Sequence, residues 1–286
     1  MSSRRAKFAI ALMAALGLAV ISSSAQAFDD AKYPDWSGQW LRGRGATNQA
    51  TWDPDKPWGL KQEAPLTPKY QAIFEANLED QKAGGQGSDP SWLCIPSAMP
   101  RIMLAVQPFE IVVTPDATYM MFEIFSQLRR IFTDGRAWPD QITNTFAGYS
   151  IGHWEDTDGD GRYDTLVVET RAIKGPHSYD NSGIPFHEDE KAVVTERIYG
   201  DKTNPNVLYA EITTVDNALT RPWTVKRSYR RLQTKPPLWS EYICTEDNRH
   251  VQIGDQNYVI SADGHLMPTR KGQSPPDLRH FDQAVR

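Results

Sequence analysis

The sequence predicts an all-β, mainly antiparallel fold, either a meander barrel or a two-sheet sandwich, with an N-terminal wrapping segment that contains one helix. Short runs rich in β-branched and aromatic residues follow Cys94, and Pro, Asp, Gly and Asn separate them. No helical pattern lies between the runs, so neighbouring strands are expected to pair antiparallel. The runs are RIMLAV, FEIVVT, ATYMMFEI, QLRRIF, GYSIGHWE, YDTLVVETR, VVTERIYG, VLYAEITTVD, WTVKRSYRR and WSEYI.

Residues 1–27 have the features of a secretory signal peptide. Three basic residues precede an apolar run over 8–21, and small residues at Ala25 and Ala27 mark a cleavage site. The run is too short to span a membrane, so we expect a mature chain that begins at Phe28 and is periplasmic or secreted. The pair Arg4-Arg5 leaves twin-arginine and ordinary secretory export both open.

The charge balance excludes some classes of partner. Three of the 31 basic residues belong to the signal segment, so 28 remain against 36 acidic residues, a balance of −8. This acidic balance disfavours nucleic acid and anionic membranes as partners. No later segment is apolar enough to predict a membrane span. The oligomeric state stays open.

Residues 28–92 are predicted to wrap the β domain. One short strand is expected around Ser37–Leu41, and the clearest helix of the chain over 68–82, capped by Thr67 with Pro68 at its first position. Helical spacing predicts the packing face of this helix, and a glycine pair predicts where it ends. The face comprises Tyr70, Ile73, Phe74 and Leu78, and the stop is Gly84-Gly85. The barrel or sandwich domain covers 93–264, and 265–286 form a surface tail.

The chain has two cysteines, Cys94 and Cys244. An even number of cysteines in an oxidising compartment predicts a disulfide, and two buried free thiols are the alternative. A bridge between residues 150 positions apart would join the start of the β domain to its end.

Four strand runs place a charge on an otherwise apolar face. The charges are Glu123, Glu169, Glu196 and Arg227, the last on a face with Trp223 and Tyr229. Buried charges must be paired, so one interpretation is a polar pocket inside a barrel, with Glu196, Arg227, Trp223 and Tyr229 binding the ligand. The alternative is that these mixed faces meet water or the N-terminal segment.

The stretch 156–164 reads as a calcium loop, DxDxDGxxD. Its expected ligands are the side chains of Asp156, Asp158, Asp160 and Asp164 and the backbone carbonyl of Arg162. Val167 stands where an EF-hand has its bidentate Glu, and strands flank the loop, so a hairpin tip is predicted instead of an EF-hand. Because every ligand is local, the calcium would be structural. The alternative is a solvated acidic turn.

An acid–base enzyme is the second hypothesis, acting as a lyase, an isomerase or a hydrolase. Its catalytic residues would be His153, Glu123, Arg130 and Arg136. The alternative for Asp-Gly-Arg at 134–136 is a plain turn with a salt bridge. A transition-metal site from His153, His177, His187 and Glu188 fits no known spacing. We interpret residues 176–189 as a surface loop that would cover a pocket mouth.

Several motifs occur together in this chain: PDWSGQW at 34–40, CIPSAMPRIM at 94–103, RRIFTDGRAWP at 129–139 and GYSIGHW at 148–154, followed by LVVETR, TERIYG and DNALTRPWTV. This set resembles a large family of secreted bacterial proteins of unknown function, a resemblance that implies no activity. Separately, Gly38-Gln39-Trp40 is similar to the G-x-W start of lipocalin-like barrels. That second resemblance favours a barrel over a sandwich and implies an apolar ligand inside it.

The favoured hypothesis is therefore a β-barrel that holds a small apolar or amphipathic molecule, with an acid–base enzyme second and an envelope structural or interaction protein third. The first two predict a concave interior that includes Glu123, Glu196 and Arg227. The third predicts a filled core and an exposed apolar patch.

Overall fold

The structure is a computed structural model that describes residues 29–44, 49–235 and 237–277. The chain divides into residues 1–30 and a compact unit that begins at Ala31. The predicted signal peptide over 1–27 lies outside the described residues. Among the residues that the structure describes, no helix combines the length and the apolar character that a bilayer crossing requires.

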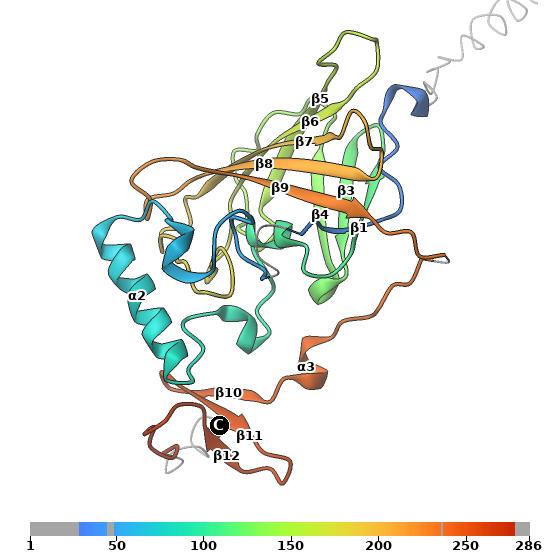
Figure 1. Cartoon of the computed structure of the whole chain (residues 1–286). Helices are drawn as coiled ribbons and strands as arrows, with labels where there is room; N and C mark the ends of the chain where they lie inside the picture. Colours follow the sequence, from blue (N-terminus) through green and yellow to red (C-terminus); the bar gives the residue numbers. More distant parts are fainter. Residues whose placement is uncertain (1–28, 45–48, 236, 278–286) are drawn as a thin grey trace, which may run out of the picture. The chain divides into compact units, whose positions relative to one another are not determined.

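Nine strands form a closed barrel in the order β1 to β9, as Figure 1 shows. The prediction of an all-β barrel with one long helix is confirmed. The strands are β1 (Gln39–Arg42), β2 (Phe109–Val113), β3 (Ala117–Phe122), β4 (Gln127–Phe132), β5 (Tyr149–Glu155), β6 (Thr165–Arg171), β7 (Val193–Gly200), β8 (Val207–Val215) and β9 (Trp223–Arg231).

The short strand β1 closes the barrel by pairing with both β2 and β9. Trp40 lies opposite Phe109 on one side and Arg231 on the other, and its side chain is buried. Its indole N–H donates to the carbonyl of Trp36 at 2.9 Å, and the Arg231 guanidinium lies 4.8 Å from its ring centroid. The G-x-W segment therefore lies at the seam of the barrel.

One strand pair departs from the predicted antiparallel pattern. β4 and β5 are parallel, with Ile131 opposite Ser150 and Phe132 opposite Ile151. Parallel neighbours cannot be joined by a tight hairpin and need a longer connection, which residues 133–148 supply. The other neighbours around the barrel pair antiparallel, as expected.

The barrel interior is filled by protein, including a segment predicted as a strand. RIMLAV contains the 3-10 helix η4 (Arg101–Leu104), so the strand prediction is wrong there. All four residues of η4 are buried, and the Tyr229 hydroxyl of β9 donates to the Met103 carbonyl at 2.7 Å. A continuous apolar run without alternation fits a buried helical turn as well as a buried strand.

The predicted helix is α2 (Pro68–Lys82), with the bounds that the sequence indicates. It buries Tyr70, Phe74 and Leu78, whereas Ile73, predicted on the same face, is 37% exposed. Thr67 occupies the N-cap without the expected side-chain hydrogen bond. Gly84 follows the C-cap with a φ of 92°, a left-handed conformation that favours glycine. Shorter 3-10 elements are η1 (Asp30–Lys32), η2 (Gly59–Gln62), η3 (Pro90–Leu93) and the turn η5 (Ile124–Ser126).

After the barrel the chain forms a second, three-stranded sheet that the sequence reading missed. WSEYI (239–243) is not the predicted strand, and it leads into the short helix α3 (Cys244–Asp247). The sheet that follows is antiparallel and consists of β10 (His250–Ile253), β11 (Gln256–Ile260) and β12 (Leu266–Pro268). The predicted surface tail from 265 therefore begins with a strand, and its described part ends at Asp277.

Candidate functional site

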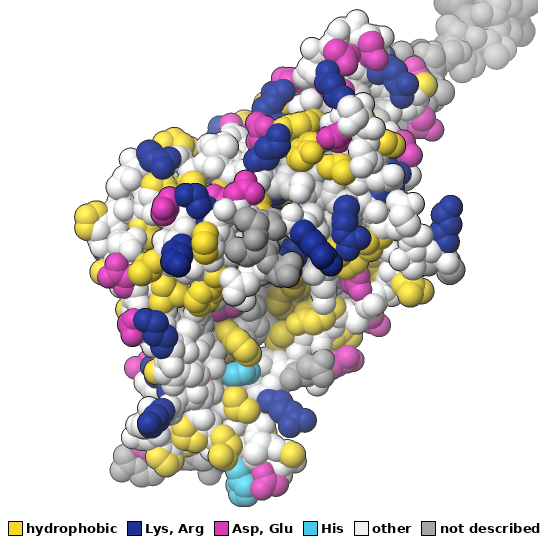
Figure 2. Space-filling view, viewed as in Figure 1, with side chains coloured by type: hydrophobic (Ala, Val, Ile, Leu, Met, Phe, Trp, Pro, Cys, Tyr) yellow, Lys and Arg dark blue, Asp and Glu magenta, His cyan; other side chains and the backbone are white. Residues whose placement is uncertain are grey.

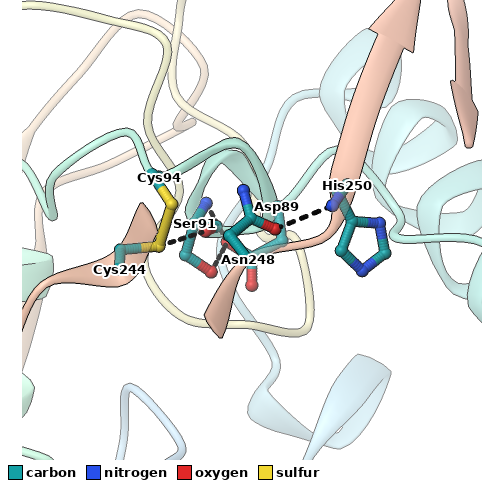
Figure 3. Close-up of a disulfide and its surroundings, with 6 residues drawn as sticks. All are labelled: Asp89, Ser91, Cys94, Cys244, Asn248 and His250. Atoms are coloured by element: carbon teal, nitrogen blue, oxygen red, sulfur yellow. Dashed lines mark hydrogen bonds between the residues drawn. A yellow bond between two sulfur atoms is a disulfide. The ribbon is translucent and has the colours of Figure 1, made fainter. Parts of the chain in front are cut away.

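The predicted disulfide between Cys94 and Cys244 is formed, and Figure 3 shows its surroundings. Cys94 follows η3 and has a φ of 55°, while Cys244 begins α3. The Cys244 sulfur lies 3.9 Å from the carbonyl oxygen of Ser91 in η3. The bridge thus joins the segment before β10 to a turn that lies between β1 and β2 in the sequence.

A cavity of about 650 Å³ adjoins this bridge, and Cys244 is part of its wall. Figure 2 shows the corresponding face hollowed, with hydrophobic side chains along the margins. Much of the lining is apolar and comes from η4, the residues after it and η5. The aliphatic members are Ile102, Leu104, Ala105, Val106 and Ile124, and the aromatic members are Trp58, Trp92, Phe125, Tyr242 and His250.

A buried ion pair forms one polar part of the lining. The Arg101 Nη1 donates to Asp89 Oδ1 at 2.7 Å, and its Nη2 donates to Asp89 Oδ2 at 3.2 Å. Nη1 also donates to the Ser178 hydroxyl at 2.8 Å. Asp89 is the N-cap of η3 and accepts from the Ser91 backbone N–H and hydroxyl. Both charged side chains are about nine-tenths buried or more, so the pair is held in one geometry.

His250 at the start of β10 also lines the cavity. Its ring lies 4.8 Å from the Trp92 ring. The side-chain amides of Gln86 and Asn257 approach its Nδ1 at 3.4 and 3.3 Å. The neighbouring Arg249 also lines the cavity, and its side chain has no ion pair with a described residue.

Sequence reasoning missed this site because its walls come from segments far apart in the chain. The available signal was Arg101, a charge inside the apolar stretch SAMPRIMLAV. A charge in a buried run needs a partner, and Asp89 is that partner here.

The four residues predicted to bind a ligand point into the barrel as expected, but into packed protein. Glu196, Arg227, Trp223 and Tyr229 are each 5% exposed or less, and none lines the cavity beside the disulfide. Arg227 donates to the backbone carbonyls of Thr51 and Trp52. In place of a concave polar interior, the barrel has a filled core.

Glu196 is paired with Arg129 of β4, a residue of the predicted strand QLRRIF. The Arg129 Nη1 donates to Glu196 Oε1 at 3.0 Å, and its Nη2 contacts Oε2. Nη2 also donates to Thr170 Oγ1 at 3.0 Å, and Nη1 lies 3.5 Å from the Met103 sulfur. Both charged side chains are fully buried. Alternation in QLRRIF, with Arg129 on the face of Ile131, was the signal for this inward arginine.

The four predicted catalytic residues do not form one cluster, although the guanidinium groups of Arg130 and Arg136 both lie over the Phe132 ring. Glu123 follows β3 and accepts from the Ser240 backbone N–H at 2.9 Å. His153 is exposed on β5 and lies 3.3 Å from Glu155. The guanidinium of Arg130 lies over the Tyr119 ring. Arg136 pairs with Asp134 in the exposed turn that was the alternative interpretation, and this contact lowers the pKa of Asp134 to about 2.

The acidic loop joins β5 to β6. One oxygen each of Asp156, Asp158 and Asp164 lies within 4.8 Å of the others. Asp160 is not part of this group and accepts from the backbone N–H of Arg162 at 2.8 Å; Asp156 and Asp164 also accept backbone N–H groups of the loop. Burial alone would raise the pKa of Asp164, but hydrogen bonds from its threonine neighbours hold it below the usual value. Three of the four predicted aspartates thus form a compact group.

Residues 176–189 are not the surface loop that the sequence predicted. Tyr179, Asp180, Ser182 and Ile184 are fully buried, because this segment packs against the barrel strands and Trp52. The exposed Asn181 does line the cavity, so the loop contributes to the site at that position.

Comparison with known proteins adds no family assignment. A scan against protein-family models matches none of them, and a search of the curated proteins finds no match. The resemblance to secreted bacterial proteins therefore stays a prediction, and the chemistry of the cavity rests on its geometry.

Proposed function

We propose that this protein binds a small amphipathic molecule in the cavity beside the disulfide. The observation that carries the proposal is a hollow of about 650 Å³ with an apolar, aromatic-rich lining and a few fixed polar groups. Ligand sites in proteins fall mostly between 300 and 1,000 Å³ and combine these features. The site differs from the one that the lipocalin resemblance implies, because the ligand lies outside the packed barrel core.

Titration with the neutral fluorescent probe N-phenyl-1-naphthylamine tests this proposal. We expect saturable binding to the wild-type protein and a loss of about fivefold or more in affinity in Tyr242→Ala, since an aromatic wall contributes about 1 kcal/mol or more. Tyr119→Ala removes a similarly half-buried tyrosine from the barrel exterior and is the matched control. No saturable binding to the wild type, or equal loss in both variants, would overturn the proposal.

We also propose that a calcium ion occupies the acidic loop and stabilises the β5–β6 hairpin. The support is the spacing of the aspartates and the approach of three carboxylates to one another. Affinity is expected in the range of extracellular modules, about 10⁻⁴–10⁻³ M.

Thermal unfolding of chelated protein with added calcium tests the loop. We expect the melting temperature to rise with calcium in the wild type and in Asp116→Asn, a control in an exposed turn, but not in Asp158→Asn. If calcium changes neither the melting temperature nor the heat of titration of the wild type, the loop is a solvated acidic turn.

Export to the periplasm or the medium is a further part of the proposal. The disulfide supports it, because such bridges persist in oxidising compartments. Sequencing of the protein from its natural source should give an N-terminus at Phe28. A chain that retains residues 1–27 and stays with the cytosol would contradict export.

A further inference from the structure

We propose that the amphipathic ligand carries a carboxylate, and that this group binds the free edge of the Arg101 guanidinium. This inference rests on the proposed function and names the chemical class of the ligand. It follows from counting the hydrogen bonds of one buried side chain.

An arginine has five N–H donors, and Arg101 uses three of them within the protein. Both Nη1 donors are taken by Asp89 and Ser178, and one Nη2 donor is taken by Asp89. The two that remain are Nε–H and the second Nη2–H. They lie on one edge of the guanidinium and point in parallel, and neither donates to an acceptor within the described part of the chain.

This edge is not sealed inside the protein at Nε. Arg101 is part of the cavity wall, and its Nε, which has no acceptor among the described residues, is not fully buried. By contrast, the Nε atoms of Arg129 and Arg227 in the barrel core are fully buried and have no hydrogen-bond partner among the described residues. Asp89 therefore holds the guanidinium by its end and leaves the side edge presented to a ligand.

A parallel pair of N–H donors matches the two oxygens of a carboxylate. The guanidinium is already fixed by its buried partners, so little side-chain freedom is lost when a ligand binds. Asp89 neutralises the charge of Arg101, and Arg249 on the same cavity wall supplies a further positive charge. Apolar neighbours from Leu104 to Val106, together with Phe125, are suited to the hydrophobic part of the ligand.

Displacement of N-phenyl-1-naphthylamine by decanoic acid and by decan-1-ol tests the inference on the full mature protein. These molecules share an alkyl chain and differ in the charged group. We expect the acid, as its anion near neutral pH, to displace the probe at least about tenfold more effectively, the range for hydrogen bonds to a charged group. Arg101→Lys keeps the charge but lacks the parallel pair of N–H donors, and it should remove most of this preference.

A second variant keeps the test valid if Arg101→Lys does not fold. Arg249→Gln alters an exposed side chain and should reduce the preference for the acid, whereas Arg230→Gln, on an exposed position of β9, should not. Circular dichroism and thermal melting establish that each variant is folded.

The outcomes separate the two proposals. If the probe binds but the acid and the alcohol displace it equally, the carboxylate inference fails and the cavity remains a binding site. If Arg101→Lys folds and keeps the full preference, the assignment to Arg101 fails. If the probe does not bind the wild type, the proposed function fails and the inference fails with it.

Discussion

At the scale of single residues, the ion pair of Arg129 and Glu196 determines how the barrel interior is filled. It joins β4 to β7 across the core, and the sulfur atoms of Met103 and Met120 lie beside the guanidinium. A charge in this environment is tolerated only with its partner and its hydrogen bonds in place. Removing one partner of this pair should therefore lower the free energy of unfolding more than removing one partner of an ion pair on the barrel surface.

Replacing Glu196 should show this difference in stability directly. Glu196→Gln leaves the Arg129 charge buried without a counterion, so we expect the free energy of unfolding to fall by about 3–5 kcal/mol in urea titrations. Glu169→Gln is the matched control, because Glu169 pairs with Arg171 on the outer face of β6 and should cost about 1 kcal/mol or less. Equal losses in the two variants would contradict a special role for the buried pair.

His177 gives the protein a pH dependence at the same scale. Its ring lies 4.1 Å from the Phe186 ring, and burial lowers its pKa from 6.5 to about 4, against a smaller opposing effect of Glu190. The unfolded chain then binds more protons than the folded one between these values, so stability falls as the pH drops from about 6.5 to about 4. The loss amounts to about 3 kcal/mol when complete.

Urea unfolding measured across this pH range tests the assignment. His177→Asn should flatten this part of the profile, and His265→Asn, which alters an exposed histidine, should leave it as in the wild type. A wild-type slope that persists in His177→Asn would assign the titration to other groups.

At the scale of elements, alternation and length predicted the barrel strands from β2 to β9 and the bounds of α2 well. RIMLAV failed because all four residues of η4 are buried, which leaves no polar face to distinguish strand from helix. The strands β10 to β12 were missed because they are short and show little burial contrast, with Tyr258 their one buried residue. The parallel pair of β4 and β5 depends on the path of residues 133–148, which no local pattern encodes.

The disulfide is the element-scale feature with the clearest test. Replacing Cys94 and Cys244 together by serine releases a bridge over 150 positions, and we expect the free energy of unfolding to fall by about 2–5 kcal/mol. Binding of the neutral probe should weaken in the same variant, because Cys244 forms part of the cavity wall. Wild-type protein treated with a reductant provides the comparison. Unchanged stability and binding would show that non-covalent contacts alone hold this wall.

At the scale of the whole molecule, the cavity is a product of tertiary structure. Trp92 between β1 and β2, Phe125 between β3 and β4 and His250 after β9 meet only when the chain has folded. Strand period placed Glu196 and Arg227 on apolar faces and left open whether these faces meet a pocket, water or the N-terminal segment; both side chains are buried, and Arg227 bonds Thr51 and Trp52 of that segment. The sequence did not predict that Met103 lies against Arg129 and Tyr229 inside the barrel, because packing partners far apart in sequence leave no periodic signal.

The two sheets should differ in local stability. Strands β6 to β9 bury alternate residues along their length, while the β10–β12 sheet buries only Tyr258 within its strands. Hydrogen exchange followed by mass spectrometry should therefore show amides of β10–β12 exchanging at a lower opening free energy than those of β6–β9. Exchange of both sheets in a single step would indicate one cooperative unit.

The seam between β1 and β9 also constrains the order of folding. Trp40 must pair with Arg231, so the ring of strands closes between residues that are almost two hundred positions apart. Contacts of such high sequence separation raise the contact order and demand loop-closure entropy before they contribute stability. The hairpins from β5 to β9 form from local pairs, so they are expected to assemble first, with closure of the seam as a late and slow event.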